Sequence, residues 1–325
     1  MRRAFLKTAC AVAAIVATAI PASAADFTFK FAHAQPPTSV RHKSMELFKD
    51  NLEKASNGRI KVELFSGGAL GNEAELTDMV KMGSMQGTRG GAFAKANKKF
   101  LIYTLPFLFN DTDAVLKAMR SSFGADIAKH AEQNGYYIPA TGVAGGFRQI
   151  SNSKKPINTP DDLKGLKIRV QQSPTTIKMI QALGATPTPM AWGEVYSALQ
   201  MGVVDGAENN VTALTNGRHG EVCKFYSETE HQIVPDVLVM SAARWDALKK
   251  PQQEIIKKAA IDSFEYQKSL WGAFEKVERE KSLAMGVKFN TPNKQSFVAK
   301  VKPMIDQERK NAAIAKLLDS IAAVK

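Results

Sequence analysis

Little in this sequence points to catalysis. It has no Gly-x-Ser-x-Gly turn, no His-Glu-x-x-His pair, no phosphate-binding loop of the Walker type and no Gly-x-Gly-x-x-Gly dinucleotide motif. The five histidines are scattered along the 325 residues, and none belongs to a recognisable pair of nucleophile and oriented base. We therefore expect a protein that is not an enzyme and that uses no cofactor.

Cysteine is almost absent as well. Only Cys10 and Cys223 occur, and Cys10 lies in a segment that we expect to be cleaved, so the mature chain can form no intrachain disulfide. Cys223 stands four residues after His219, a spacing that places both side chains on one face of a helix. The two can form a metal pair, but no third ligand is evident. A buried, unreactive cysteine is the preferred interpretation, and no metal site is predicted.

The N-terminus has the pattern of an export signal. Arg2, Arg3 and Lys7 precede an apolar run that is too short to span a bilayer, and Ala22-Ser-Ala is a small-x-small cleavage site. We therefore expect residues 1–24 to be a cleavable signal peptide and the mature protein to be periplasmic. The Arg-Arg start also resembles a twin-arginine signal, so general secretion and twin-arginine export both stay open.

Acidic residues are outnumbered, with 31 Asp and Glu against 44 Lys and Arg. Loss of residues 1–24 removes three cations and no acid, which lowers the net charge from +13 to +10. The lysines are scattered and no basic motif carries aromatic residues, so nucleic acid is not an expected partner. An anionic membrane surface, steering of an anionic ligand and a solvated basic surface all remain compatible with this charge.

Hydrophobic periodicity predicts alternating strands and helices, which is typical of an α/β chain, and about 300 residues are enough for two domains. Strands are predicted over 26–32, 60–65 and 237–240, helices over 40–56, 73–82 and 111–134, and a core strand with a loop over 100–109. A helix over 251–285 would be roughly 50 Å long, more than one small lobe needs, so we expect it to run across both. Another amphipathic helix is predicted over 293–323.

Two arginines and an asparagine have settings that suit anion binding. Arg148 in Gly-Phe-Arg-Gln-Ile and Arg169 in Lys-Ile-Arg-Val each fall in a short strand-like run bounded by glycine, so each can project from a strand end toward a cleft. The guanidinium group matches a carboxylate through two parallel hydrogen bonds. Asn209 follows a glycine turn and opens a helical pattern. Taken singly, these residues also fit two surface arginines and a helix cap.

The motifs around these residues resemble a known family. They are, in order, Gly146-Phe-Arg-Gln-Ile-Ser-Asn, Thr159-Pro-Asp-Asp-Leu-Lys-Gly-Leu-Lys-Ile-Arg-Val, Leu183-Gly-Ala-Thr-Pro-Thr-Pro-Met and Glu194-Val-Tyr-Ser-Ala-Leu-Gln-Met-Gly-Val-Val-Asp-Gly-Ala-Glu-Asn. This order is similar to that of the solute-binding proteins of tripartite ATP-independent periplasmic (TRAP) transporters, the DctP family, from about Phe27 to the C-terminus. The resemblance implies that Arg169 holds the substrate carboxylate and that Arg148 and Asn209 contact the ligand.

The resemblance also implies a fold. It is an α/β fold of the two-lobed periplasmic-binding-protein type, with crossing strands and a long helix spanning both lobes. We place the first lobe at 25–146 plus 235–274 and the second at 147–234 plus 275–325.

Three further candidates lie in the first lobe. The resemblance makes Glu73 an acceptor for substrate hydroxyls, although a favourable first-turn charge on a helix dipole explains it equally well. Arg89 stands between glycines and is a candidate contact or a surface arginine. His42 lies near a helix start that follows a strand, where loops face the ligand crevice, and a solvated histidine is the alternative.

Three more candidates lie in the second lobe. Trp192 at a predicted helix start can cover the apolar face of a ligand or pack in the core. Glu208 can orient Arg169 or accept from a substrate hydroxyl. His231 is a contact by resemblance to relatives that bind sugar acids, against a structural histidine near a hinge.

The sequence as a whole predicts a receptor that closes on a small organic acid and delivers it to TRAP membrane permease subunits. A sugar acid such as a hexuronate is preferred, with a C4-dicarboxylate close behind, and the latter would need Arg89 or Arg148 at its second carboxylate. A periplasmic sensor subunit for a signalling kinase, or an enzyme acting on a hydroxy acid, stays open as an alternative. A monomer is expected.

Overall fold

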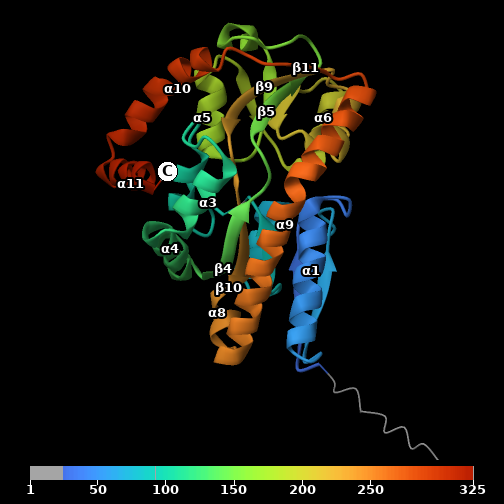
Figure 1. The fold of residues 1–325 in the computed structure, drawn as a ribbon, viewed down its shortest axis with the longest axis vertical. Helices are drawn as coiled ribbons and strands as arrows, with labels where there is room; N and C mark the ends of the chain where they lie inside the picture. The colour runs from blue at the N-terminus through green and yellow to red at the C-terminus, as the bar shows by residue number, and fades with distance from the viewer. Residues whose placement is uncertain (1–24, 92, 325) are drawn as a thin grey trace, which may run out of the picture.

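The protein has two α/β lobes, each built on one mixed sheet (Figure 1). The computed structural model describes residues 25–91 and 93–324, so the predicted signal peptide lies outside the described residues. The sheet of lobe I has the order β2-β1-β3-β10-β4, and that of lobe II has the order β11-β9-β5-β8-β6-β7. The predicted two-lobed α/β fold is therefore confirmed.

The lobe I sheet has one strand, β10, that runs antiparallel to the other four. Its strands are β1 (Phe27–Ala32), β2 (Ile60–Phe65), β3 (Gly87–Gly90), β4 (Tyr136–Val143) and β10 (Pro235–Ser241). Its helices are α1 (Val40–Ala55), α2 (Glu73–Lys81), α3 (Thr112–Arg120), α4 (Ser122–Lys129) and α8 (Ala242–Asp246). β1 is parallel to β2 and β3, and β10 is antiparallel to β3 and β4.

In lobe II, ends of three neighbouring strands lie side by side at one end of the sheet. Its strands are β5 (Arg148–Asn152), β6 (Lys167–Val170), β7 (Thr186–Pro189), β8 (Gly206–Asn209), β9 (Phe225–Gln232) and β11 (Lys288–Asn290). Its helices are α5 (Pro174–Ala182), α6 (Val195–Gln200), α7 (Thr212–Thr215) and α10 (Lys294–Arg309). β8 is parallel to β6 and antiparallel to β5. The carboxyl ends of β6 and β8 therefore meet the start of β5.

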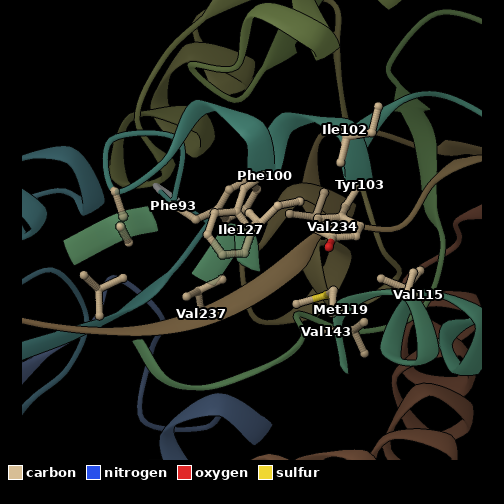
Figure 2. Close-up of a cluster of buried hydrophobic side chains, with 14 of the residues drawn as sticks. Phe93, Phe100, Ile102, Tyr103, Val115, Met119, Ile127, Val143, Val234 and Val237 are labelled. Carbon is tan, nitrogen blue, oxygen red and sulfur yellow. The ribbon is translucent and has the colours of Figure 1, made fainter. Parts of the chain in front are cut away.

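Two chain segments cross between the lobes. Residues 144–147 join β4 to β5, residues 233–234 join β9 to β10, and the Ala144 N–H donates to the Val234 carbonyl at 3.0 Å. Figure 2 shows Val143, next to one crossing, and Val234, within the other, in one apolar cluster with Val115 and Met119 of α3. The lobe I core therefore extends up to the point where the chain crosses.

Helix α9 (Lys250–Ala284) runs along both lobes (Figure 1). Near its start, Ile256 and Phe264 pack in one cluster with Phe48 of α1. Near its end, Glu278 accepts a hydrogen bond from Thr215 of α7. The predicted helix that spans both lobes is thus confirmed. No helix among residues 25–324 is both long enough and apolar enough to cross a membrane.

The C-terminal tail returns to lobe I. A single helix is predicted over 293–323, but the structure has two, α10 and α11 (Ala312–Val324), because the Asn311 side chain accepts from the Ala313 and Ile314 N–H groups and starts a new helix. Phe297 and Val301 of α10 pack in the lobe II core. Leu318 and Ile321 of α11 pack in the cluster of α3 in lobe I, whereas the division predicted from the sequence assigns all of 275–325 to lobe II.

Two other elements also differ from the predictions, each for a reason in the local sequence. The apolar stretch 100–109 begins in a 3₁₀ helix, Lys98–Thr104, where a strand is predicted, because a short apolar run does not separate a buried strand from a buried helical turn. The helix predicted over 111–134 is broken at Ser121, whose hydroxyl accepts from the Gly124 N–H and begins α4.

The contact between the tail and lobe I can be measured by substitution. Ile321 is fully buried, so Ile321→Ala should lower the free energy of unfolding by about 2–5 kcal/mol in urea denaturation. Ile261 on α9 is half exposed, and Ile261→Ala is the matched control, with an expected change within about 0.5 kcal/mol. Equal effects of the two substitutions would contradict the packing of α11 on lobe I.

Candidate functional site

A cleft of about 610 Å³ lies between the two lobes. Loops that follow β1 and precede α2 form its lobe I wall, and the residues that follow β6, β7 and β8 form its lobe II wall. Side chains of α9 complete it. The predicted contacts that line this cleft are Arg148, Arg169, Asn209, Glu73 and Trp192.

Arg169 is a buried cation without a carboxylate partner. It lies in β6, only 3% exposed, and its Nε and Nη2 both donate to the Met190 carbonyl, at 3.2 and 2.8 Å. No Asp or Glu of the described residues lies within ion-pair distance of it. Burial lowers the pKa of Arg169 to about 10, so the group stays charged at neutral pH.

Arg148 begins β5 and is neutralised inside the protein. Its Nη2 donates to Glu208 Oε1 at 2.9 Å and to the Glu208 carbonyl at 2.7 Å, and its Nε pairs with the other carboxylate oxygen. Its Nη1 donates to Asn209 Oδ1 at 2.9 Å. Asn209 is the last residue of β8 and does not open a helix, since α7 begins at Thr212. The structure therefore brings the three predicted residues Arg148, Arg169 and Asn209 together at one sheet edge.

Glu208 and His231 lie behind these three residues, in the interior of the protein. Both are fully buried and neither lines the cleft. Burial raises the pKa of the Glu208 carboxyl, but Arg148 and His231 together outweigh this effect and lower the pKa to about 2. His231 Nε2 lies 3.6 Å from Glu208 Oε2, and its Nδ1 lies 2.7 Å from the Thr229 hydroxyl. Glu208 thus orients Arg148, where the sequence suggested Arg169 or a substrate hydroxyl.

A third arginine lines the cleft, from the lobe I wall, and it was not predicted from the sequence. Arg41 lines the cleft from the first turn of α1. Its Nη1 lies 3.1 Å from Glu73 Oε1 and its Nη2 lies 3.2 Å from Asp236 Oδ1. His42, which was selected, is one residue further on and points instead to His33, with 3.1 Å between their ring nitrogens. A step of one residue turns a side chain by about 100° around a helix, so Arg41 faces the cleft and His42 does not.

Arg89 does not reach the cleft. It is fully buried in β3, its Nε donates to Asp236 Oδ2 at 3.0 Å, and its guanidinium lies over the Phe264 ring at 3.6 Å. Its remaining donors meet Ser44 and Gln267. These partners satisfy its charge and its hydrogen bonds from within lobe I.

Aromatic rings form the apolar part of the cleft. Trp192 lines it in a 3₁₀ turn, Trp192–Glu194, and packs against the His219 ring at 5.2 Å between centroids. Trp271 and Phe274 of α9 line it from the other side. The sequence signal for these two was weak, because aromatic residues at helical spacing are read as core.

The His219–Cys223 pair has no sign of metal chemistry. Cys223 is buried, and burial raises the pKa of its thiol to about 12, so it stays protonated. His219 is buried too, and burial lowers its pKa to about 3. Within residues 25–324 no cluster of three or more His, Cys, Asp or Glu side chains is placed to hold a metal ion.

Comparison with known proteins identifies the family of this two-lobed fold. The model of bacterial extracellular solute-binding proteins, family 7, matches residues 31–311. The chain belongs to the DctP family of TRAP-transporter solute-binding proteins. It is therefore an extracytoplasmic solute receptor of the TRAP type and not an enzyme, as predicted from the sequence.

Three similar proteins are a C4-dicarboxylate-binding protein and two structures with a bound uronate. The chain is 31% identical to the C4-dicarboxylate-binding periplasmic protein DctP of Rhodobacter capsulatus, over 84% of this chain and 81% of that protein. A TRAP solute-binding protein of Anaerococcus prevotii with bound α/β-D-glucuronate matches with a TM-score of 0.88 and 30% identity, over 92% of this chain and 98% of that one. One from Bradyrhizobium sp. BTAi1, in complex with α/β-D-galacturonate, matches with a TM-score of 0.86 and 37% identity, over 90% and 99%.

The buried His219 predicts a pH dependence of stability. Its folded-state pKa of about 3 lies below the unfolded value of about 6.5, so the unfolded chain binds a proton that the folded chain does not as pH falls from 6.5 toward 3. Its neutral form thus contributes stability that is lost in this window, by up to about 1.4 kcal/mol per pH unit. In urea denaturation between pH 7 and pH 4.5, His219→Phe should reduce the slope of unfolding free energy against pH. A variant with the wild-type slope would contradict this, whatever its absolute stability.

Proposed function

We propose that this receptor binds a hexuronate and that Arg169 holds the ligand carboxylate. The supporting observation is which of the four buried arginines have a carboxylate partner. Arg41, Arg89 and Arg148 each lie within ion-pair distance of a carboxylate, whereas Arg169, on the cleft wall, has only a carbonyl acceptor among the described residues. A buried unpaired charge is costly, so this site favours an anion.

A monoanion fits this cleft better than a dicarboxylate. A dicarboxylate needs a second unpaired cation, and the two arginines predicted for that role are already engaged. Arg89 lies outside the cleft against Asp236, and Arg148 is held by Glu208. One net positive charge at the sheet edge matches one carboxylate.

The rest of the cleft suits a hydroxylated ring. Glu73, Gln171, Asn209 and Asn210 line it and offer acceptors and donors for hydroxyl groups. The Trp192 ring supplies an apolar face for the C–H side of a sugar. Structural relatives with bound glucuronate and galacturonate, at 30–37% identity, support the same ligand class.

Closure of the lobes is the proposed route to transport. The crossings at 144–147 and 233–234 allow a hinge, and a carboxylate on Arg169 would add a bridge between lobe II and the lobe I wall. At the cleft mouth, the Thr38 hydroxyl of lobe I already donates to Asn216 Oδ1 of lobe II at 3.0 Å. The closed receptor presents a surface that differs from the open one, and TRAP membrane permease subunits are the proposed recipient of the ligand.

A ligand screen tests the function. Thermal unfolding of the mature protein should shift upward with D-glucuronate or D-galacturonate and not with succinate or malate. A ligand at 100 times its dissociation constant adds about 2.7 kcal/mol of stability, which is readily measured. A shift with succinate or malate alone would make this a dicarboxylate receptor. No shift with any carboxylate would remove the proposal of an anion site.

The role of Arg169 has its own test by titration calorimetry. Loss of one buried charge partner costs about 2–5 kcal/mol, so Arg169→Ala should weaken hexuronate binding by roughly 30-fold to several thousand-fold. Arg59→Ala is the control, because Arg59 lies on the surface and pairs with Asp26, and it should leave the affinity unchanged. Unchanged affinity in Arg169→Ala as well would exclude this residue as the carboxylate clamp.

A further inference from the structure

The lobe I wall of the cleft carries a cation whose charge is cancelled by fixed neighbours. Arg41 is 7% exposed and lies between the carboxylates of Glu73 and Asp236. Asp236 is fully buried and also binds Arg89. These four residues form one cluster of two cations and two anions, so its net charge is zero. Of the four, only Arg41 and Glu73 line the cleft.

The Glu73 carboxylate is fixed in position but can still accept further hydrogen bonds. Its Oε1 is bonded to Arg41 Nη1 at 3.1 Å and its Oε2 accepts from the Gly91 N–H at 3.1 Å. A Cβ at residue 90 would lie 2.6 Å from Glu73 Oε1, so Gly90 is what leaves room for this carboxylate. An ionised carboxylate accepts about four hydrogen bonds, which leaves lone pairs on Glu73 for ligand hydroxyls.

The lobe II wall has one more positive charge than the neutral cluster of the lobe I wall. Arg148 and Glu208 cancel, and Arg169 adds one uncompensated cation. The other charged residues that line the cleft, Glu75, Lys95 and Glu194, are exposed at its rim, where solvent and salt screen them. The buried walls therefore carry a net charge of +1, located at Arg169.

From this geometry we propose that Glu73 is a specificity-determining residue that masks the positive charge of Arg41 and so restricts the cleft to acids with a single carboxylate. The proposal rests on the proposed binding of a hexuronate. A ligand with carboxylates at both ends would place its second negative charge beside Glu73 while Arg41 is already neutralised. A hydroxyl or hemiacetal group in the same place donates to Glu73 instead.

Titration calorimetry on the full mature chain, with D-glucuronate and D-glucarate as probes, tests the masking. The two acids share a six-carbon hydroxylated chain, and glucarate has a second carboxylate at the far end. Wild type should prefer D-glucuronate. Glu73→Gln keeps the shape and frees the charge of Arg41, so the ratio of the two affinities should move toward D-glucarate by at least tenfold.

Glu75→Gln is the matched control. It removes the same charge from the same helix, but Glu75 accepts from the Asn72 backbone N–H in a capping box and pairs with no arginine in the described part of the chain. A glutamine preserves that cap, so the affinity ratio should stay within about twofold of wild type. Arg41→Gln should shift the ratio in the opposite direction, further toward D-glucuronate, because it leaves Glu73 unpaired.

The outcomes separate this inference from the proposed function. If wild type binds neither acid and no D-galacturonate either, the proposed hexuronate function fails. If wild type binds D-glucuronate but Glu73→Gln changes the ratio no more than Glu75→Gln, the masking role is overturned and the function stands. A wild-type preference for D-glucarate would also overturn the masking role. Thermal unfolding of each variant shows that any loss of binding is not a loss of folding.

Discussion

A guanidinium that leaves water has to meet negative charge, and this requirement organises the molecule around its cleft. Four arginines are buried beside the cleft or just behind it. Glu73 of α2 and Asp236 of β10 together neutralise Arg41 and Arg89, and Glu208 of β8 neutralises Arg148. Asp236 and Glu208 are fully buried on sheet strands, and all three acids belong to the protein, so the compensation does not depend on a ligand. What remains is one cation, Arg169, at one strand end, and the proposed binding of an anion rests on it.

The same network connects the cleft with the segments that join the lobes. Asp236 stands two residues after the crossing at 233–234. Gln267 of α9 accepts from Arg89 at 3.1 Å and donates to the Val143 carbonyl at 2.8 Å, next to the other crossing. The wall that faces the ligand, the long helix and both crossings are thus parts of one hydrogen-bonded unit. The proposed movement of the lobes would have to leave that unit intact, because breaking it would leave unpaired charges in the core.

The sequence was sufficient for the features that repeat along the chain or match a motif. Periodicity located the long helix within one residue of α9 at each end, and the strand-like runs located Arg148 and Arg169 on β5 and β6. The sequence was insufficient where a partner distant along the chain determines whether a side chain is buried. The burial of Arg89 against Asp236, 147 residues away, has no local signal. The break at Asn311 did have one, a capping residue inside an amphipathic run, and there the apolar pattern on both sides concealed it.

The hydrogen bond between Thr38 and Asn216 has a kinetic consequence. It joins two exposed, uncharged side chains at the mouth of the cleft, and such a bond contributes about 0.5–1.5 kcal/mol net. In the proposed closure, that energy would add only roughly a twofold to tenfold bias toward the closed form. The residence time of a bound solute would then depend on what the solute itself adds on both walls. A receptor built this way retains its cargo only as long as the cargo holds the lobes together.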